Sequence, residues 1–557
     1  MKDVQKNSLK KLGFLAIGLF ILNFASYYIY KRFDVTQDKR YTLSETTKKI
    51  IDGVDSPLII DVFLEGTFPA DFKKLQSETR QLLEEFSAYN SNITFQFVNP
   101  IEKVEVMKEL AYKGMLPINV SVTEKGKQTQ EVVFPWAKVK YADKGANVQL
   151  HKNSISQTTE GNISSSVQHL EYAFAEAINT VSKKEMKKIA FFSGKGCLEI
   201  PNYFDILNKL DNDYFVKRIP IDSIKNNPKA FSEALNKFDL TVIPRPKEKF
   251  TETEKQVLDQ FIMKGGKTLW LVDGTNAEME NLYNESGSTL VSNNDLNLTD
   301  MFFKYGFRIN PQMIKDEYGT PLKLASGKEG SESQMETYNW KMAPFIYPAS
   351  KKHPIVKNTD GVKFNFCSPI ELLKTNTKTT ILLESSPYSK VIGTPSVVSL
   401  EMITEETSPK DYADGGLIPV AVLLEGTFTS VYNNRVLPFK DATFLNKSVP
   451  TKMIVISDGD VIKNQLDKGK PIELGYDKYT GQFFGNKEFI LNCVNYLLDD
   501  NGLINIRSKD VTLPVLDKQS VHDNYNQTQL LTVALPIVLL ALFGFIFTYL
   551  RKKKYKY

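Results

Sequence analysis

The sequence predicts an α/β protein with two membrane spans and a large body between them. Three observations carry this prediction. Two long uncharged apolar runs lie near the ends of the 557-residue chain. Between them, short apolar runs alternate with amphipathic helix patterns, an order typical of α/β proteins. Hydrophobic residues make up 42% of the chain and charged residues 24%, which excludes a disordered or collagen-like protein.

The first predicted element is a membrane helix from Leu12 to Tyr30. An uncharged run of this length forms a helix of about 28 Å, enough to cross the hydrocarbon core of a bilayer. The alternative is a cleaved signal peptide. No small-x-small cleavage site follows the run, and Tyr27, Tyr28 and Tyr30 are typical of an interfacial aromatic belt. The sequence therefore favours an uncleaved anchor.

A first folded domain is predicted after a polar tether, Lys31 to Leu43. A buried strand, Leu58 to Leu64, is followed by an amphipathic helix, Phe72 to Tyr89, and by a strand in "ITFQFVNP". Strand, helix and strand in this order predict a parallel unit. A short helix near Glu102 to Lys113 and a hairpin turning at Lys125-Gly126 follow. This order resembles a thioredoxin-like domain, but the CxxC motif is missing, so redox chemistry is not implied.

A second domain is predicted after a helix that carries apolar residues from Val167 to Val181, with the boundary near Lys183. Strands are expected in "KIAFFSG", "FDLTVIPRP" and "KTLWLVDG". The helix between the last two begins with a capping box, Thr251 to Glu254, and ends at Gly265-Gly266. This alternation predicts a doubly wound, Rossmann-like parallel sheet.

The remainder of the body gives weaker signals. Residues 285–345 are polar with weak strand patterns, and the stretch 325–334 is predicted to be mobile. Extra strands are expected later, at Lys378–Leu383, Leu417–Leu424 and Thr451–Ser457. A last helix is expected at Lys487–Leu498.

The second membrane helix is predicted from Leu530 to Leu550, about 32 Å long, with Pro536 near its start. Arg551 to Lys554 form a basic cluster directly after it, whereas the residues before it lack a basic run. The positive-inside rule then places both termini in the cytoplasm. Lys31 to Gln529 become one extracytoplasmic body, which we expect in the periplasm of a bacterium whose inner membrane holds both spans.

Composition excludes several classes of protein. The formal net charge is only +5, which argues against a nucleic-acid partner. The three cysteines, Cys197, Cys367 and Cys493, form no CxxC, and the four histidines form no metal-binding spacing. No GxxxxGK[ST] motif is present, so no P-loop is expected. We therefore expect no cofactor, no metal and no ATPase activity in this chain.

Candidate site residues lie where the predicted parallel strands end, because open α/β sheets bind ligands at carboxyl ends of strands. Lys195 lies in a glycine turn that could bind an anion, although a tight strand-to-helix turn explains it better. Arg245, Asp273 and Asp458 could form a polar site for a ligand or partner. The alternative is capping and turn chemistry, since aspartate before glycine is a common turn former.

Two further features were weighed for function. Cys197 lacks the flanking glycines of a nucleophile elbow and is expected to be a small buried hydrophobe. Ala541 and Gly544 lie three apart on one face of the second span and could pack against another membrane helix. The alternative is the ordinary composition of a membrane helix.

Several segments together resemble a known family. They are "FDLTVIPRPKEKFTETEKQVLDQFIMKGGKTLWLVDG" (238–274), "MFFKYGFRIN" (301–310), "LIPVAVLLEGTFTSVYNNR" (417–435), "MIVISDGDVIKNQ" (453–465) and "LGYDKYTGQFFGNKEFILNCVNYLLDDNGLINIRSKDVTLPVLDK" (474–518). With two terminal spans, the chain resembles the GldG family, auxiliary components of gliding-motility ABC transporters in Bacteroidetes. Many relatives have a GHGE-like turn where this chain has "SGKGCLE", with Lys195 in the histidine place.

The resemblance implies a non-ATPase subunit that acts with a polytopic ABC permease (GldF) and a cytoplasmic ATPase (GldA). Together with the predicted spans and the boundary near Lys183, it divides the chain into five regions: the N-terminus and first span (1–33), a thioredoxin-like domain (34–182), an ABC-transporter auxiliary α/β domain (183–470), a C-terminal helix with a juxtamembrane segment (471–529), and the second span with its basic tail (530–557).

Three functions remain open at this point. The first is assembly and coupling within an ABC transporter that serves gliding motility. The second is a periplasmic substrate-binding component, for which a deep polar pocket presenting a small-molecule or glycan cleft would be the discriminating feature. The third, an anchored hydrolase, would need a clustered nucleophile and base, for which the chain offers few histidines and cysteines.

Overall fold

The computed structural model describes residues 2–28, 34, 42–66, 68–102, 104–124, 127–152, 159–183, 185–329, 332–348, 353–357, 359–412, 415–508 and 518–555. The chain divides into two compact units, Met1–Asp510 and Val511–Tyr557. Most of the predicted tether from Lys31 to Leu43, and the predicted turn at Lys125-Gly126, lie outside the described residues.

The second unit is helical. Its elements are α11 (Lys518–Asp523), α12 (Tyr525–Gln529), a π-helical turn η9 (Leu530–Ala534) and α13 (Leu535–Tyr555). From Tyr525 to Lys554 the helix runs for 30 residues and is strongly apolar. Among the described residues, it is the one helix with the length and composition to cross a membrane. The π-helical turn lies just before Pro536, which lacks the N–H that a regular helix would use there.

The N-terminal helix α1 (Lys2–Tyr28) contains the described part of the first predicted span. Its apolar side chains from Leu12 to Phe24 are exposed, so no other described part of the chain covers them. A helix with this pattern needs an apolar surrounding or a partner to cover those side chains.

A four-stranded sheet follows, with the strand order β2-β1-β5-β6. β1 (Leu58–Val62) and β2 (Ile93–Phe97) pair in parallel and are connected by α3 (Ala70–Tyr89), as the strand-helix-strand pattern predicts. β5 (Trp136–Tyr141) and β6 (Lys144–Gln149) complete the sheet in antiparallel fashion.

Helices cover this sheet, and a separate hairpin extends beside it. α3 packs against α5 (Thr159–Ser182), where the rings of Phe86 and Phe174 meet edge to face at 6.5 Å. The predicted hairpin exists, but it is a separate two-stranded sheet, made of β3 (Ile118–Glu124) and β4 (Lys127–Val133). The remaining helices of this region are α2 (Glu45–Asp52), η1 (Pro100–Glu102) and α4 (Val104–Tyr112).

A seven-stranded sheet forms the centre of the larger part of the body, in the order β18-β21-β22-β10-β9-β7-β8. Five neighbouring strands are parallel, as predicted for this domain: β7 (Lys188–Ser193), β8 (Phe215–Pro220), β9 (Leu240–Pro244), β10 (Lys267–Leu271) and β22 (Thr451–Ile456). Two antiparallel strands extend one edge, β21 (Pro419–Gly426) and β18 (Lys378–Glu384).

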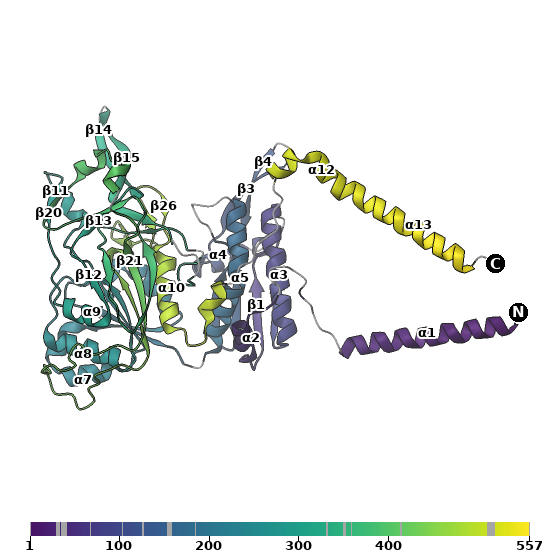
Figure 1. The fold of residues 1–557 in the computed structure, drawn as a ribbon, viewed down its shortest axis with the longest axis horizontal. Coiled ribbons are helices and arrows are strands. Elements are labelled where there is room, and N and C mark those ends of the chain that lie inside the picture. Colours follow the sequence, from purple (N-terminus) through teal and green to yellow (C-terminus); the bar gives the residue numbers. More distant parts are fainter. Residues whose placement is uncertain are drawn as a thin grey trace. The chain divides into compact units, whose positions relative to one another are not determined.

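Helices cover both faces of the seven-stranded sheet (Figure 1). Alternate strand residues point to opposite cores, because side chains alternate along a strand. Phe191 and Leu269 join α6 (Phe204–Asp211) and α10 (Asn486–Leu498) in one core. Phe192 and Trp270 join α7 (Pro228–Leu235), α8 (Glu252–Met263) and α9 (Thr299–Tyr305) in the other. The α/β class predicted from the sequence is confirmed.

A long insertion between β10 and β21 carries small sheets. They pair β11 (Ser288–Val291) with β20 (Ser396–Ser399), β12 (Phe307–Ile309) with β17 (Ile370–Leu372), and β13 (Met313–Asp316) with β19 (Ser389–Ile392). A long hairpin of β14 (Gly319–Glu329) and β15 (Glu332–Ile346) projects from the body, and β16 (Val362–Lys363) extends it (Figure 1). The described part of the stretch 325–334 is therefore in strands, where the sequence predicted mobility.

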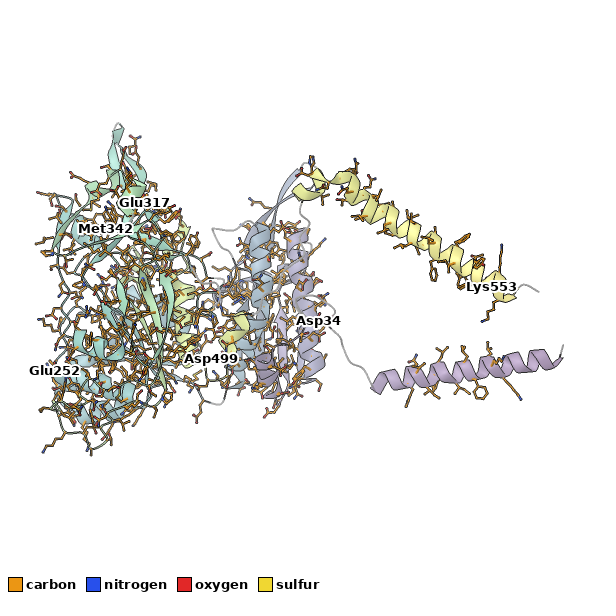
Figure 2. The ribbon with its side chains drawn as sticks, in the orientation of Figure 1. Asp34, Glu252, Glu317, Met342, Asp499 and Lys553 are labelled. Carbon is orange, nitrogen blue, oxygen red and sulfur yellow. The ribbon has the colours of Figure 1, made fainter. Side chains whose placement is uncertain are left out.

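Polar contacts anchor the base of this hairpin. Glu317, labelled in Figure 2, precedes β14. It accepts hydrogen bonds from Lys341 Nζ over 2.9 Å and from the hydroxyls of Thr407 and Tyr412. On the other side of the base, Met342 is buried against Trp340 and Phe366 in a small apolar core. The hairpin is thus fixed at its base to two separate parts of the insertion.

Short elements complete the body. The turns are η2 (Ile200–Asn202), η3 (Ile221–Lys225), η4 (Met279–Leu282), η5 (Leu400–Thr404), η6 (Pro409–Tyr412), η7 (Gly459–Ile462) and η8 (Leu503–Ser508). Two small hairpins pair β23 (Leu466–Asp467) with β24 (Lys470–Pro471) and β25 (Tyr476–Asp477) with β26 (Gln482–Phe483).

Candidate functional site

Four loops follow the carboxyl ends of the parallel strands β7, β9, β10 and β22. β8 lies on one side of β7 and β9 on the other, so the winding of the sheet reverses between β7 and β9. Open α/β sheets bind ligands at such a reversal point. The residues that the sequence singles out, Lys195, Arg245, Asp273 and Asp458, all lie in these loops.

At the reversal point, the loop after β7 packs directly against the loop after β9. Gly194, Lys195 and Gly196 all have positive φ, which makes the turn tight. The carbonyl of Lys195 accepts hydrogen bonds from the backbone N–H of Lys247 over 2.8 Å and of Glu248 over 3.0 Å. A Cβ atom at Gly196 would lie 2.8 Å from Lys247 Cβ, so the loops after β7 and β9 are in direct contact.

The side chain of Lys195 points to the start of α8. Its Nζ lies 3.3 Å from a carboxylate oxygen of Glu254 and 3.7 Å from one of Asp222. Glu254 also closes the predicted capping box, since it accepts a hydrogen bond from Thr251 N over 2.8 Å. Lys195 is therefore part of the anchorage of α8 and is separate from the other three predicted residues.

Arg245 is the centre of a buried carboxylate cluster. Its Nε donates to Asp273 Oδ2 over 2.8 Å, and its terminal nitrogens lie 3.0 Å from Asp460 Oδ1 and 3.2 Å from Glu278 Oε1. The guanidinium side chain is only 3% exposed. Burial alone would lower the pKa of Arg245, but Asp460, Asp273 and Glu278 raise it above its ordinary value.

Asp273 and Asp458 connect the cluster to the turn η7. Asp273 accepts a hydrogen bond from Gly459 N over 2.5 Å. Asp458 accepts from Asn365 N over 2.6 Å and caps η7 by accepting from Asp460 N over 2.7 Å. Burial, with the neighbouring charges of Asp460 and Asp273, raises the pKa of Asp458 well above its ordinary value. Burial also raises the pKa of Asp273, against the opposing charge of Arg245.

The structure thus brings Arg245 and Asp273 into contact and places Asp458 beside them. Sequence reasoning missed two members of the cluster, Asp460 and Glu278. Asp460 had a usable signal, because it follows Asp458 in the same strand-end turn. Glu278 lies in the irregular loop after β10. No periodicity or motif there predicts that its side chain reaches Arg245.

Lysines add positive charge at the edge of the cluster. Lys247 Nζ lies 2.5 Å from Glu278, and Lys463 Nζ lies 3.9 Å from Asp460 but only 2.7 Å from Glu280, which is outside the cluster. Arg245 has a carboxylate of Asp273, Glu278 or Asp460 at each of its three nitrogen atoms. These ion pairs hold the strand-end loops together, because removing one partner would leave a buried charge unpaired.

A cavity of about 560 Å³ lies beside the cluster, and Asp460 is in its wall. The wall also includes residues of η4, of the β14–β15 hairpin and of the segment from Lys463 to Phe484. Its volume is within the range of small-molecule sites, about 300–1,000 Å³. The aromatic stretch "GYDKYTGQFFGN" supplies Tyr476, Tyr479 and Phe484 to this wall.

The cysteines do not contribute a reactive group to this region. Burial, with the nearby charge of Asp222, raises the pKa of Cys197 to about 12. Cys367 and Cys493 are also buried, and burial raises the pKa of each thiol well above its ordinary value. Within the described residues, no group of three or more histidine, cysteine or acidic side chains is arranged to hold a metal ion.

The two small residues singled out in the second span lie on α13. Ala541 and Gly544 are exposed, and a Cβ atom added at Gly544 would meet nothing within 4 Å. Within its own unit, this helix face is open.

Comparisons with known proteins identify the larger part of the chain. Residues 186–493 match the family described as "ABC-type uncharacterized transport system", and residues 37–140 match a domain of unknown function (DUF7088). No curated protein matches the chain. A solved structure, the "mmIFT52 N-terminal domain", is 13% identical and covers 56% of this chain and 99% of its own, with a TM-score of 0.33. The first match covers more than half of the 557 residues, and the chain therefore belongs to the family of ABC transport system auxiliary components.

Proposed function

We propose that this protein is a non-ATPase, two-span auxiliary subunit that couples an extracytoplasmic body to the permease and ATPase of an ABC transporter. Family membership supports association with ABC transporter components. The resemblance to GldG supports a permease of the GldF type, an ATPase of the GldA type and a role in bacterial gliding motility. The strand order β2-β1-β5-β6 supports a thioredoxin-like arrangement for the N-terminal domain.

One observation carries the coupling role: η8, near the C-terminal end of the body, contacts helices that pack on each of the two larger sheets. We call this set of contacts the joint. Arg507, in η8, donates to Glu488 Oε1 and to Asn492 Oδ1 of α10, over 2.6 Å each. The same guanidinium lies 5.2 Å from the ring centre of Tyr172, on α5. Because η8 is the last described element before the second unit, a pull on that part of the chain would reach both α5 and α10 through Arg507.

Further polar contacts strengthen this joint. Lys152 Nζ lies 2.5 Å from the same Glu488 oxygen, and Asn495 of α10 donates to Glu176 of α5 over 2.7 Å. Burial alone would raise the pKa of Glu488, but Lys152 and Arg507 lower it below its ordinary value. Two cations therefore hold one carboxylate between the sheets, and α5 and α10 are joined by hydrogen bonds.

The two-span topology is supported by the sequence at both ends. The apolar run in α1 is exposed in the first unit, as a span would be. Lysines precede it, and Arg551 to Lys554 follow the second apolar run, so the positive-inside rule puts both termini in the cytoplasm. The body then lies in the periplasm.

The experiment targets the open face of α13. Replacing Ala541 and Gly544 together by leucine keeps the helix apolar but prevents close approach of a neighbouring helix. We expect normal membrane levels, loss of the co-purifying permease and ATPase, and loss of surface motility in a gliding host. Leu539→Phe with Ile546→Phe adds volume on the opposite helical face and is the matched control, for which both partners should be retained.

Wild-type amounts of both partners with the leucine variant would show that this face is not the interface. Failure of the wild-type protein to retain either partner would contradict the auxiliary-subunit proposal itself.

A ligand-binding role is the second candidate, and the cavity beside Arg245 favours it. A substrate-binding component needs a cavity with polar groups in its wall, and 560 Å³ is enough for a small ligand. In this role, the body would present the ligand to the permease while the same spans keep it in the complex. Neither role requires a catalytic group, and we propose that the chain is not an enzyme.

A further inference from the structure

The chemistry of the cavity wall shows what it would hold. This inference rests on the ligand-binding candidate above and narrows it to a class of ligand.

Most charged side chains in the wall have a charged partner; among the described residues, the exposed Lys323 has none, and Lys478 Nζ lies 4.0 Å from Asp467. Lys463 Nζ lies 2.7 Å from Glu280 Oε1, and Lys363 Nζ lies 3.1 Å from Asp477 Oδ2. Asp460 is opposite Arg245 at 3.0 Å. A charged group placed against these ion pairs would have to break one of them or stay without a counter-charge, and both cost free energy.

Some neutral polar groups in the wall have no hydrogen-bond partner among the described residues. The side-chain amide of Asn365 and the Nε2 of Gln465 form no hydrogen bond within the described part of the chain. Unpaired neutral donors and acceptors favour a ligand that carries many neutral hydrogen-bonding groups.

Aromatic side chains provide the apolar part of the wall. Tyr283, after η4, and Tyr479, between β25 and β26, are each 60% exposed. Burial, and then the neighbouring Tyr479, raises the pKa of Tyr283, so the phenol of Tyr283 stays neutral at physiological pH. Large exposed aromatic rings at a cavity offer flat surfaces for C–H groups of a ligand, with a hydroxyl at the outer end of each ring.

We propose that this cavity binds a neutral saccharide of about two or three rings, with Tyr283 and Tyr479 packing against its C–H faces and the free amide groups reading its hydroxyls. A sugar ring combines neutral hydroxyls, which both donate and accept, with an apolar C–H face. The wall offers a group for each of these features, and apart from the exposed Lys323 its charged side chains have charged partners.

Binding is tested on the full-length protein in detergent by isothermal titration calorimetry. The probes are N,N′,N″-triacetylchitotriose, maltotriose and cellotriose as neutral trisaccharides. Deacetylated chitotriose is the cationic counterpart of the first probe, and trigalacturonate is an anionic trisaccharide. We expect at least one neutral probe to bind saturably, and both charged probes to bind at least tenfold more weakly.

Variants connect the binding to this cavity. Tyr479→Ala and Tyr283→Ala should each weaken the neutral probe by tenfold or more, while the melting temperature changes little because both rings are exposed. Tyr112→Ala removes an exposed tyrosine of α4 outside the cavity and should leave binding unchanged.

The proposal is overturned if no neutral probe binds at millimolar concentration, if a charged probe binds as tightly, or if the cavity variants bind like the wild type. It is also overturned if a neutral hydrophilic pentapeptide displaces the sugar or binds in its place. Both tyrosine variants should still co-purify with permease and ATPase, so loss of sugar binding and loss of the auxiliary role are separate results.

Discussion

Gly459 lies so close to Arg245 that a Cβ atom at position 459 would be 2.2 Å from Arg245 Cγ. The backbone N–H of the same glycine donates to Asp273, the ion-pair partner of Arg245. The turn after β22 and the side chain after β9 are thus packed as one piece, and the wall of the neighbouring cavity depends on both.

Gly459→Ala should lower the free energy of unfolding by about 1–3 kcal/mol, because the added methyl group forces Arg245 or η7 to move. Thermal unfolding of the full-length protein measures the effect. Gly393→Ala is the matched control, since a Cβ there would meet nothing within 4 Å. Equal melting temperatures for the two variants would show that the contact is easily relaxed.

Asp458→Asn should flatten the dependence of stability on pH above the ordinary carboxyl pKa of 3.8. The pKa of Asp458 is higher in the folded than in the unfolded chain, so the folded state binds the proton more tightly between those two values. The wild-type protein therefore loses stability as pH rises through this interval, and an amide cannot titrate there.

Denaturant unfolding at a series of pH values gives the slope for wild type and variant. The absolute stability of the variant will also drop, because asparagine offers one acceptor oxygen for two backbone N–H groups. Asp143→Asn, in an exposed turn, should keep the wild-type slope. A wild-type slope in Asp458→Asn would mean that this carboxyl does not titrate in the interval.

Thr251→Ala should destabilise the protein by about 1 kcal/mol, because α8 loses the hydroxyl that accepts from Glu254 N. Thr251→Ser keeps the hydroxyl and should restore most of the loss. The difference in unfolding free energy between the serine and alanine variants reports the contribution of the hydroxyl. If the serine variant were as unstable as the alanine variant, the loss would be due to the missing methyl group.

Reporter fusions should place Asp143 outside the cytoplasm and the C-terminus inside it. The reason is the cluster Arg551–Lys554 after the second apolar run. Alkaline phosphatase and a fluorescent protein, fused at each position, give opposite signals in the two compartments. Cytoplasmic fluorescence from the fusion at Asp143 would contradict the topology.

Much of the fold could be predicted because its elements have strong local patterns. The capping box at Thr251, the apolar stripe of α3 and the continuous apolar run of β9 each fix an element without reference to distant residues. The parallel sheet follows from their alternation. The hairpin at 118–133 was also predictable, but its separation from the four-stranded sheet was not, because strand pairing depends on partners far along the chain.

The site was predictable only where strand ends mark it. Arg245 and Asp273 follow directly after buried strands, so their meeting at one edge of the sheet could be expected. Lys195 also follows a parallel strand, but its side chain extends to Glu254 at the start of α8 and not to Arg245. The position of a residue at a strand end does not predict the direction of its side chain. The cavity wall comes from segments as distant as η4, β14 and β25, and no short motif reveals such an assembly.

The three buried thiols can be used as probes of local unfolding. Cys197, Cys367 and Cys493 lie in the larger part of the body, and each is both shielded and held in its protonated form. A thiol reagent can react only when the surrounding core opens, so the labelling rate at each position reports how often that part of the body comes apart. The same shielding keeps the three sulfurs from forming stray disulfides.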